Sequence, residues 1–235
     1  MQEAAFAALG LEGWTYQHLP VPEHLFAETV RALPDAGFLG ANVTIPHKQA
    51  ALAVATDASD AARAIGAANT LTFADGRIEA DNTDAPALID ALPAIPHTAL
   101  VLGAGGSARA AAWALRETGA EVRIYNRTRD RGERLAADLG VQMATEPGEA
   151  DLLVNCTSVG LADPDRSPIG DVQAAVVVDL AYADRETALI RQAKAKGATT
   201  VDGLDFLVRQ GALSLTRWTG RPAPLDAMRA AVRAR

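Results

Sequence analysis

The chain lacks the features of disulfide-rich, membrane-spanning and nucleic-acid-binding proteins. It has a single cysteine, Cys156, in 235 residues, which excludes an internal disulfide and is typical of a reducing compartment. No apolar run approaches the roughly 18–20 residues that a membrane helix needs, and the acidic Glu3 stands where a secretory signal would be basic. Acidic residues outnumber basic residues by 29 to 22, which argues against a nucleic-acid partner. We therefore expect a soluble, cytoplasmic protein.

Metal-ligand spacing is also lacking. The four histidines follow no pattern suited to metal ligation, and there is no HExxH-type motif. We expect no metal.

One stretch has the pattern of a dinucleotide-binding turn. The apolar run 98–102 ends at Gly103 and gives way to Gly105 and Gly106, and a helical pattern follows. The first glycine permits a tight turn, the second lets backbone approach a pyrophosphate, and the small Ala108 lets helix and strand pack closely. A helix N-terminus also offers N–H groups and the positive end of a dipole to a phosphate. Glycine-rich turns serve many folds, but in this strand–helix context the pattern indicates dinucleotide binding.

Strand and helix patterns alternate regularly around this turn. Strands are predicted at 98–102, 121–125, 152–155, 176–180 and 199–201, with helices at 110–117, 130–139 and 186–196. This alternation is typical of a parallel, doubly wound sheet. The preceding part mixes helices with short strands, among them predicted strands at 14–19 and 37–45. The fold prediction is α/β, with two α/β units joined near residues 81–97.

The segment after the second strand of the doubly wound unit distinguishes NAD from NADP. An acidic residue there accepts from the ribose 2′-hydroxyl of NAD, whereas this chain has Asn126, Arg127, Thr128 and Arg129. Guanidinium groups grip phosphate in a bidentate way. The alternative is a solvated run of charge, but its position favours NADP.

Seven motifs together resemble the shikimate dehydrogenase family. They lie at 42–48 (NVTIPHK), 65–70 (IGAANT), 82–84 (NTD), 103–106 (GAGG), 126–128 (NRT), 155–160 (NCTSVG) and 202–210 (DGLDFLVRQ). They follow the family's order and span nearly the whole chain.

The resemblance implies two domains and one reaction. The first domain, residues 1–84 with the C-terminal helices 205–235, would bind substrate, and a Rossmann-like domain at 85–204 would bind NADP. The reaction would be the reversible, NADPH-dependent reduction of 3-dehydroshikimate to shikimate in chorismate and aromatic amino-acid biosynthesis. By similarity, Lys48 and Asp84 form the catalytic pair.

The chemistry of that pair is plausible on its own terms. Hydride delivery to a ketone creates an alkoxide that needs a proton, and a lysine beside a carboxylate can supply it or take it back. Without the resemblance, Lys48 would be a surface residue in the first turn of a helix and Asp84 a helix N-cap.

Further contacts are implied by the same resemblance. The polar side chains that would bind the substrate are Asn42, Thr44, Asn69, Thr83, Tyr182 and Gln210. The residues that would bind the cofactor are Asp60, Gly103, Ala104, Gly105, Gly106, Ser107, Ala108, Asn126, Arg127, Thr128, Arg129, Thr157, Leu180 and Gly203. A ring with several hydroxyls and a carboxylate needs amide and hydroxyl partners of this kind.

The sequence departs from the family at its start. Family members begin with a strand and a serine-bearing loop, whereas this sequence opens at the helix that follows them. About twenty residues are missing by comparison, and those serines normally hold the substrate carboxylate. Two alternatives stay open: a paralogue acting on quinate and, because the serine loop is missing, a catalytically impaired NADP-binding module. A monomer and a homodimer are equally compatible with the sequence.

Overall fold

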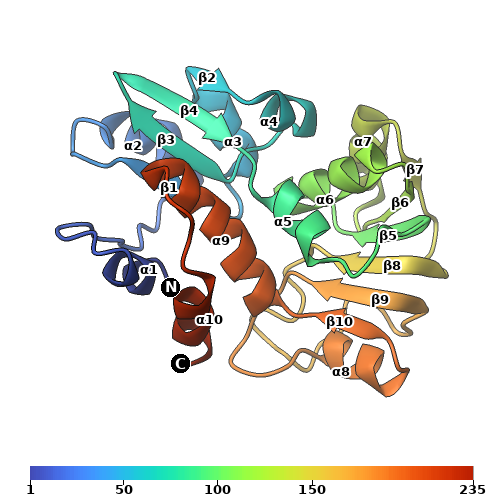
Figure 1. Cartoon of the computed structure of the whole chain (residues 1–235). Helices are drawn as coiled ribbons and strands as arrows, with labels where there is room; N and C mark the ends of the chain where they lie inside the picture. The colour runs from blue at the N-terminus through green and yellow to red at the C-terminus, as the bar shows by residue number, and fades with distance from the viewer. Residues whose placement is uncertain (235) are drawn as a thin grey trace. The chain divides into compact units, whose positions relative to one another are not determined.

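The structure, a computed structural model, describes residues 1–234 and comprises two compact units (Figure 1). The first unit contains Met1–Asp84 and the chain from Val208 onward, and the second contains Ala85–Leu207. No helix in the described range is long and apolar enough to cross a membrane.

The second unit is built on a six-stranded parallel sheet. Its strands are β5 (Thr98–Leu102), β6 (Glu121–Tyr125), β7 (Gln142–Met143), β8 (Ala150–Asn155), β9 (Ala174–Asp179) and β10 (Thr199–Val201). Their spatial order is β10-β9-β8-β5-β6-β7. The chain thus runs from β5 to one edge and then restarts with β8 on the other side of β5. The strand order reverses between β5 and β8, and ligands of such sheets bind beyond the carboxyl ends of the strands at this point.

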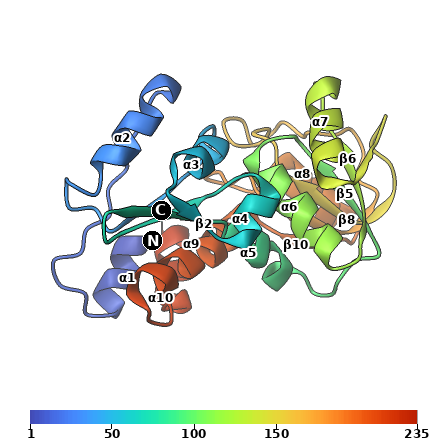
Figure 2. The same ribbon diagram turned by 90° about the horizontal axis from the view of Figure 1, so that it is seen from above.

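Helices cover both faces of this sheet because successive side chains of a strand point to opposite faces. Ala99 and Val101 of β5 pack with apolar side chains of α5 (Asp84–Ala91), α6 (Gly106–Glu117) and α7 (Arg129–Leu139). Leu100 and Leu102 pack instead with α8 (Ala188–Ala195) and the loop before β9. Figures 1 and 2 show α6 and α7 side by side, and an ion pair between Arg109 and Asp138 joins them.

The first unit contains a smaller, mixed sheet in the order β1-β3-β4-β2. Its strands are β1 (Gly40–Asn42), β2 (Asp57–Ala58), β3 (Thr70–Ala74) and β4 (Arg77–Asp81). β3 and β4 form an antiparallel hairpin through Asp75 and Gly76, whose φ angles of 50° and 71° are those of a tight turn that follows the twist of the strands. Apolar side chains of this sheet pack with α2 (Phe26–Ala32), α3 (Lys48–Val54) and α4 (Asp60–Ile65).

A second apolar cluster of the first unit joins its N-terminal and C-terminal helices. These are α1 (Gln2–Ala8), α9 (Gly203–Thr219) and α10 (Leu225–Arg233), and a short 3-10 helix, η1 (Glu23–Leu25), precedes α2. Phe6, Leu215 and Met228 are buried in this cluster. The amide of Gln2 donates to the backbone oxygen of Gly211 at 3.0 Å, so the start of the chain is held on α9.

The structure confirms the predicted fold class and corrects several element boundaries. The strands predicted at 121–125 and 199–201 have the observed bounds. The strand predicted at 14–19 is wrong, because these residues form irregular coil: local alternation does not supply the neighbour that a strand needs. The strand predicted at 37–45 is reduced to β1 for the same reason. The helix predicted at 110–117 begins earlier, at Gly106, because the glycine turn forms its first turn.

Candidate functional site

The first unit holds a lysine and an aspartate in direct contact. Lys48 is the first residue of α3, where the turn after β1 ends, and Asp84 is the first residue of α5, three residues after β4 ends. The Lys48 Nζ and the Asp84 Oδ2 are 2.6 Å apart, and the two side chains are only 10% and 4% exposed. Two local chain reversals thus bring together side chains 36 positions apart.

Asn69 holds the other oxygen of the carboxylate. Its Nδ2 donates to Asp84 Oδ1 at 2.8 Å, and its Oδ1 accepts from the backbone N–H of Thr83 at 2.7 Å. That backbone bond fixes which end of the Asn69 amide faces Asp84. The backbone N–H of Asp84 donates to Oδ1 of Asn82 at 3.1 Å. Both oxygens of the carboxylate are therefore occupied, with Oδ2 directed at the ammonium.

The two charges differ in their relation to the helices that carry them. Asp84 lies at the positive end of the α5 dipole, which stabilises an anion, whereas Lys48 lies at the same end of α3, which disfavours a cation. Desolvating two such charges is costly, and removing one partner leaves the other buried without compensation. Burying the pair therefore costs desolvation free energy, and each charge needs the other as its partner.

Hydroxyl and amide side chains extend from this pair as one hydrogen-bonded polar cluster. We define the polar cluster as Asn42, Lys48, Asn69, Thr70, Thr83, Asp84, Gln210 and Ser214. Within it, Asn42 donates to Ser214 Oγ at 2.8 Å, and the hydroxyls of Ser214 and Thr70 are also 2.8 Å apart. At the far end, the phenol of Tyr16 donates to Asn42 Oδ1 at 3.0 Å.

The structure thus brings six of the predicted catalytic and substrate-binding residues into one cluster. They are Lys48, Asp84, Asn42, Asn69, Thr83 and Gln210. Thr44 is exposed in the turn after β1, and Tyr182, which is 43% exposed, follows β9 in the second unit. Sequence reasoning missed Ser214 and Thr70. Ser214 follows Gln210 by four residues on α9, so helical periodicity alone could have placed the two on one face.

In the second unit, the glycine turn between β5 and α6 has the geometry that its sequence predicts. Gly103 has φ 113°, and a side chain there would approach the backbone oxygen of Cys156 to 3.2 Å. A side chain at Gly105, by contrast, would point into space that the described residues leave open. The first turn of α6 contains no acidic residue. The turn therefore leaves room for an anionic group at a helix N-terminus.

The polar run after β6 lies at the start of α7. Arg127, Thr128 and Arg129 are exposed, and the amide of Asn126 donates to the backbone oxygen of Thr128 at 2.7 Å. Arg129 also pairs with Glu133, with 2.6 Å between Nε and Oε1. Two guanidinium groups and a hydroxyl thus stand at the end of the second strand, where a dinucleotide fold recognises the adenosine ribose. This donor set fits a 2′-phosphate.

The loops after β8 and β9 are tied together by a buried carboxylate. Asp179 accepts from Asn155 at 2.8 Å, from the backbone N–H of Ala181 at 3.0 Å and from the hydroxyl of Thr187 at 2.6 Å. Burial raises the pKa of the Asp179 carboxyl above its ordinary value, while the three donors oppose that rise. Asn155 also accepts from the hydroxyl of Thr157 at 2.7 Å. Asp179 therefore fixes the segments that carry the predicted cofactor residues Thr157 and Leu180.

Two predicted cofactor residues differ in how closely they are constrained. Gly203 begins α9, and a side chain there would approach the backbone oxygen of Ala181 to 2.3 Å, so this position requires glycine. Asp60 is exposed at the start of α4 in the first unit, with its Oδ1 3.9 Å from Nε of Arg63.

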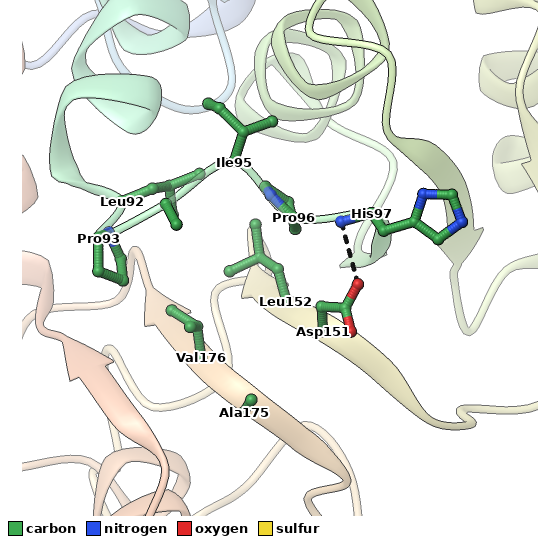
Figure 3. Close-up of a pocket in the computed structure, with 10 residues that line it drawn as sticks. Leu92, Pro93, Ile95, Pro96, His97, Asp151, Leu152, Ala175 and Val176 are labelled. Carbon is green, nitrogen blue, oxygen red and sulfur yellow. Dashed lines mark hydrogen bonds between the residues drawn. The ribbon is translucent and has the colours of Figure 1, made fainter.

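A cavity of about 190 Å³ lies at the opposite end of the parallel sheet (Figure 3). It is lined by residues 92–97 and by the first residues of β8 and β9, including Leu152 and Val176. Asp151 accepts from the backbone N–H groups of His97 and Thr98, at 3.0 and 2.8 Å, and these bonds hold its pKa below the usual range. The cavity is thus at the amino ends of the strands, away from the glycine turn. No group of three metal-ligating side chains is found in the part of the chain that the structure describes.

Comparison with known proteins decides the family. The chain is 43% identical over 250 aligned residues to the shikimate dehydrogenase (NADP(+)) of Halobacterium salinarum, and the match covers 100% of this chain and 93% of that protein. The chain belongs to the shikimate dehydrogenase family. The enzyme of the same name from Thermus thermophilus is 42% identical, with 100% of this chain and 92% of that protein covered.

Family models and a solved structure agree with this assignment. Residues 1–71 match a shikimate dehydrogenase substrate binding domain, residues 93–182 a shikimate / quinate 5-dehydrogenase model, and residues 203–233 a shikimate 5'-dehydrogenase C-terminal domain. The structure of the Thermus thermophilus enzyme in complex with NADP(H) and shikimate has a TM-score of 0.91 at 42% identity, covering 99% of this chain and 92% of that one. The family and fold predicted from the motifs are confirmed.

Proposed function

We propose that this chain is an NADP-dependent shikimate dehydrogenase, which reduces 3-dehydroshikimate reversibly to shikimate with Lys48 and Asp84 as its acid–base pair. The observation that carries the proposal is the 2.6 Å contact between a buried ammonium and a buried carboxylate inside a cluster of amides and hydroxyls. The cofactor, NADPH, supplies the hydride when it is bound.

Lys48 handles the proton of the reaction. In the reducing direction, its Nζ donates a proton to the oxygen that becomes the alcohol of shikimate, so hydride and proton together complete the new C–H and O–H bonds. In the oxidising direction, the uncharged amine accepts the hydroxyl proton. Asp84 holds Nζ through Oδ2, while Asn69 occupies Oδ1. The carboxylate thereby keeps the lysine in one position throughout the cycle.

The remaining polar residues bind the substrate hydroxyls and carboxylate. Asn42, Asn69, Thr83 and Gln210 present amide and hydroxyl groups from the polar cluster, and Thr44 and Tyr182 present exposed hydroxyls. A site built from polar groups rejects analogues that lack a matching hydroxyl, because its own groups would then stay unpaired. This explains how such a site favours a polyhydroxylated ring.

The glycine turn and the arginines bind the cofactor. The turn Gly103–Ala108 receives the pyrophosphate at the N-terminus of α6, and Asn126–Arg129 receives the 2′-phosphate. Thr157, Leu180 and Gly203 flank the nicotinamide, and Asp60 contributes from α4. Residues 1–84 with 205–235 form the substrate domain, and residues 85–204 form the NADP domain. The single cysteine supports a cytoplasmic location. The enzyme acts as a monomer or a homodimer.

Loss of NADPH absorbance with 3-dehydroshikimate tests the proposal. Lys48→Ala should lower kcat by about 10²–10⁴-fold, the usual contribution of a positioned acid or base, while NADPH binding measured by fluorescence stays unchanged. Lys194→Ala is the matched control, because that lysine is exposed and pairs with Glu186 on the surface. A kcat of Lys48→Ala within a factor of three of the wild-type kcat would overturn the catalytic assignment. NADPH binding without turnover in the wild type would indicate the impaired NADP-binding module.

Quinate is the second candidate substrate. The model that matches residues 93–182 describes shikimate and quinate 5-dehydrogenases together. The rate of NADPH formation from NADP, measured once with shikimate and once with quinate, distinguishes the two substrates. We expect kcat/KM to be higher for shikimate, and the opposite order would reassign the enzyme.

A further inference from the structure

Ser214 is a fully buried polar residue with more contacts than its place in a helix requires. It lies in α9, and its hydroxyl can donate to the backbone oxygen of Gln210, 3.1 Å away and one turn earlier. That bond alone would satisfy a serine inside a helix. Its Oγ is nevertheless also 2.8 Å from Asn42 Nδ2, 2.8 Å from Thr70 Oγ1 and 3.2 Å from Thr83 Oγ1. The three additional contacts all lie in the polar cluster.

Thr70 is the second such residue. It begins β3, is fully buried, and its hydroxyl lies 3.1 Å from Asn69 Oδ1 and 3.2 Å from Thr83 Oγ1. The Ser214 hydroxyl has one proton, which it donates either to the backbone oxygen of Gln210 or to Thr70. When it donates to Thr70, donors and acceptors run in one direction: Asn42 donates to Ser214, Ser214 to Thr70, and Thr70 to Asn69. The Asn69 amide in turn donates to Asp84. A single hydroxyl pair therefore links Asn42 at one end to the catalytic carboxylate at the other.

The surroundings of Ser214 argue that this pair is not needed for packing. The neighbouring buried positions of α9 are apolar, with Val208, Ala212 and Leu215 in the helix cluster. An alanine at 214 would bury no polar group and would suit a helix better. An apolar residue at 214 would thus suit α9, whereas the hydroxyl serves the amide of Asn42 beside it.

We propose that Ser214 and Thr70 are positioning residues for substrate binding. They hold the Asn42 amide and the Thr83 hydroxyl in the orientations in which these groups meet the substrate. The inference rests on the proposed function and deepens it, since neither residue touches the reacting atoms. Without the two hydroxyls, Asn42 and Thr83 adopt other rotamers, and substrate binding weakens before the chemical step does.

Steady-state kinetics with four variants tests this role. Ser214→Ala and Thr70→Val each remove a hydroxyl with little change of volume, and Thr70→Ser keeps the hydroxyl. Thr219→Ala is the matched control, because that hydroxyl also bonds to the backbone oxygen four residues earlier on α9, Leu215, at 2.8 Å, outside the polar cluster. Thermal unfolding of each variant measures the structural cost separately.

We expect the KM for shikimate to change and the KM for NADP to stay the same. Ser214→Ala and Thr70→Val should raise KM for shikimate about tenfold, the effect of roughly one lost hydrogen bond, with KM for NADP unchanged and kcat lowered by less than about threefold. Thr70→Ser and Thr219→Ala should match the wild type. An unchanged KM for shikimate in Ser214→Ala, or equal changes in KM for both substrates, would overturn the inference.

The outcomes also separate this inference from the proposed function. If the wild type turns over shikimate and Ser214→Ala has the same KM for shikimate as the wild type, only the positioning role is refuted. If the wild type shows no turnover, calorimetric titration with shikimate replaces KM: tenfold weaker binding by Ser214→Ala supports the positioning role, and equal affinity refutes it. Absence of both turnover and binding in the wild type overturns both proposals.

Discussion

Replacing the buried carboxylate of Asp179 by an amide should cost almost no stability, whereas deleting it should cost much. Asp179 Oδ1 accepts from Asn155 and from the backbone of Ala181, and Oδ2 accepts from Thr187. An asparagine can keep Oδ1 in the same role and donate from Nδ2 to the Thr187 hydroxyl, which accepts as well as donates. Asp179→Asn therefore retains all three contacts and removes a buried charge.

Asp179→Ala removes three hydrogen bonds, those donated by one N–H of the Asn155 amide, by the backbone of Ala181 and by the Thr187 hydroxyl. Each buried, unsatisfied donor costs about 1 kcal/mol or more, so the variant should lose roughly 3 kcal/mol of unfolding free energy. In a chain of this length, that corresponds to a fall in Tm of roughly 6–12 °C. Asp179→Asn should stay within about 1 kcal/mol of the wild type at neutral pH.

The pH dependence of stability distinguishes the charge from the hydrogen bonds. Burial raises the pKa of Asp179 above its ordinary value of 3.8, so between that value and the raised one the native state holds a proton that the unfolded chain has released. The wild type loses stability from this group as pH rises through that window. Asp179→Asn lacks this loss, so its stability relative to the wild type should improve with rising pH.

Urea denaturation between pH 4 and pH 8 measures the effect, with Asp171→Asn as the control. Asp171 is exposed, and its hydrogen bond with Lys196 holds its pKa below the ordinary value, so its contribution is lost as pH falls. That loss falls below about pH 3.8, so the control should show little change of slope between pH 4 and pH 8. If Asp179→Asn is as unstable as Asp179→Ala at every pH, the carboxylate charge itself holds the loops, and the reasoning fails.

Three further perturbations test the cofactor site and the local structure. Arg127→Ala should raise KM for NADPH about 10–100-fold and leave KM for NADH unchanged, because a charge-assisted contact to the 2′-phosphate is lost; equal effects on both cofactors would refute this role. Gly103→Ala should lower the unfolding free energy by about 1–3 kcal/mol in urea denaturation, because φ is 113° and the new carbon meets Cys156; wild-type stability would contradict the strain. Ser59→Ala should cost about 1 kcal/mol in the same assay, because its hydroxyl caps α4 by accepting from the backbone N–H of Ala62 at 3.1 Å; no change would refute the cap.

The parallel sheet can be predicted closely because its signals are local. β5, β8 and β9 contain short runs of buried apolar residues, β6 alternates buried and less buried residues, and the helices α6, α7 and α8 are each followed by a glycine. The strand at 121–125 is therefore bounded correctly from the sequence, as is the glycine turn. β7 escapes prediction, because two residues carry no periodicity.

The first unit is harder to predict because its strands depend on distant partners. The alternation at 14–19 is that of a strand, yet these residues form coil, and only three residues of the segment 37–45 pair with β3. Residue type and spacing give no sign that Lys48 and Asp84 meet; the resemblance predicts the pair, and the structure places the two side chains in contact. Their catalytic roles stay predictions.

The polar cluster itself argues for a site rather than for a stabilising feature. The core of the first unit is otherwise apolar, yet it buries a lysine, an aspartate and several hydroxyls and amides, each of which loses water on folding. A buried pair of this kind is often no more stable than two apolar residues of similar volume. Packing alone therefore gives no reason to keep Lys48, Asp84, Thr70 and Ser214 together. A reaction that moves a proton to a hydroxylated ring gives such a reason, because it needs fixed donors and acceptors that water cannot replace.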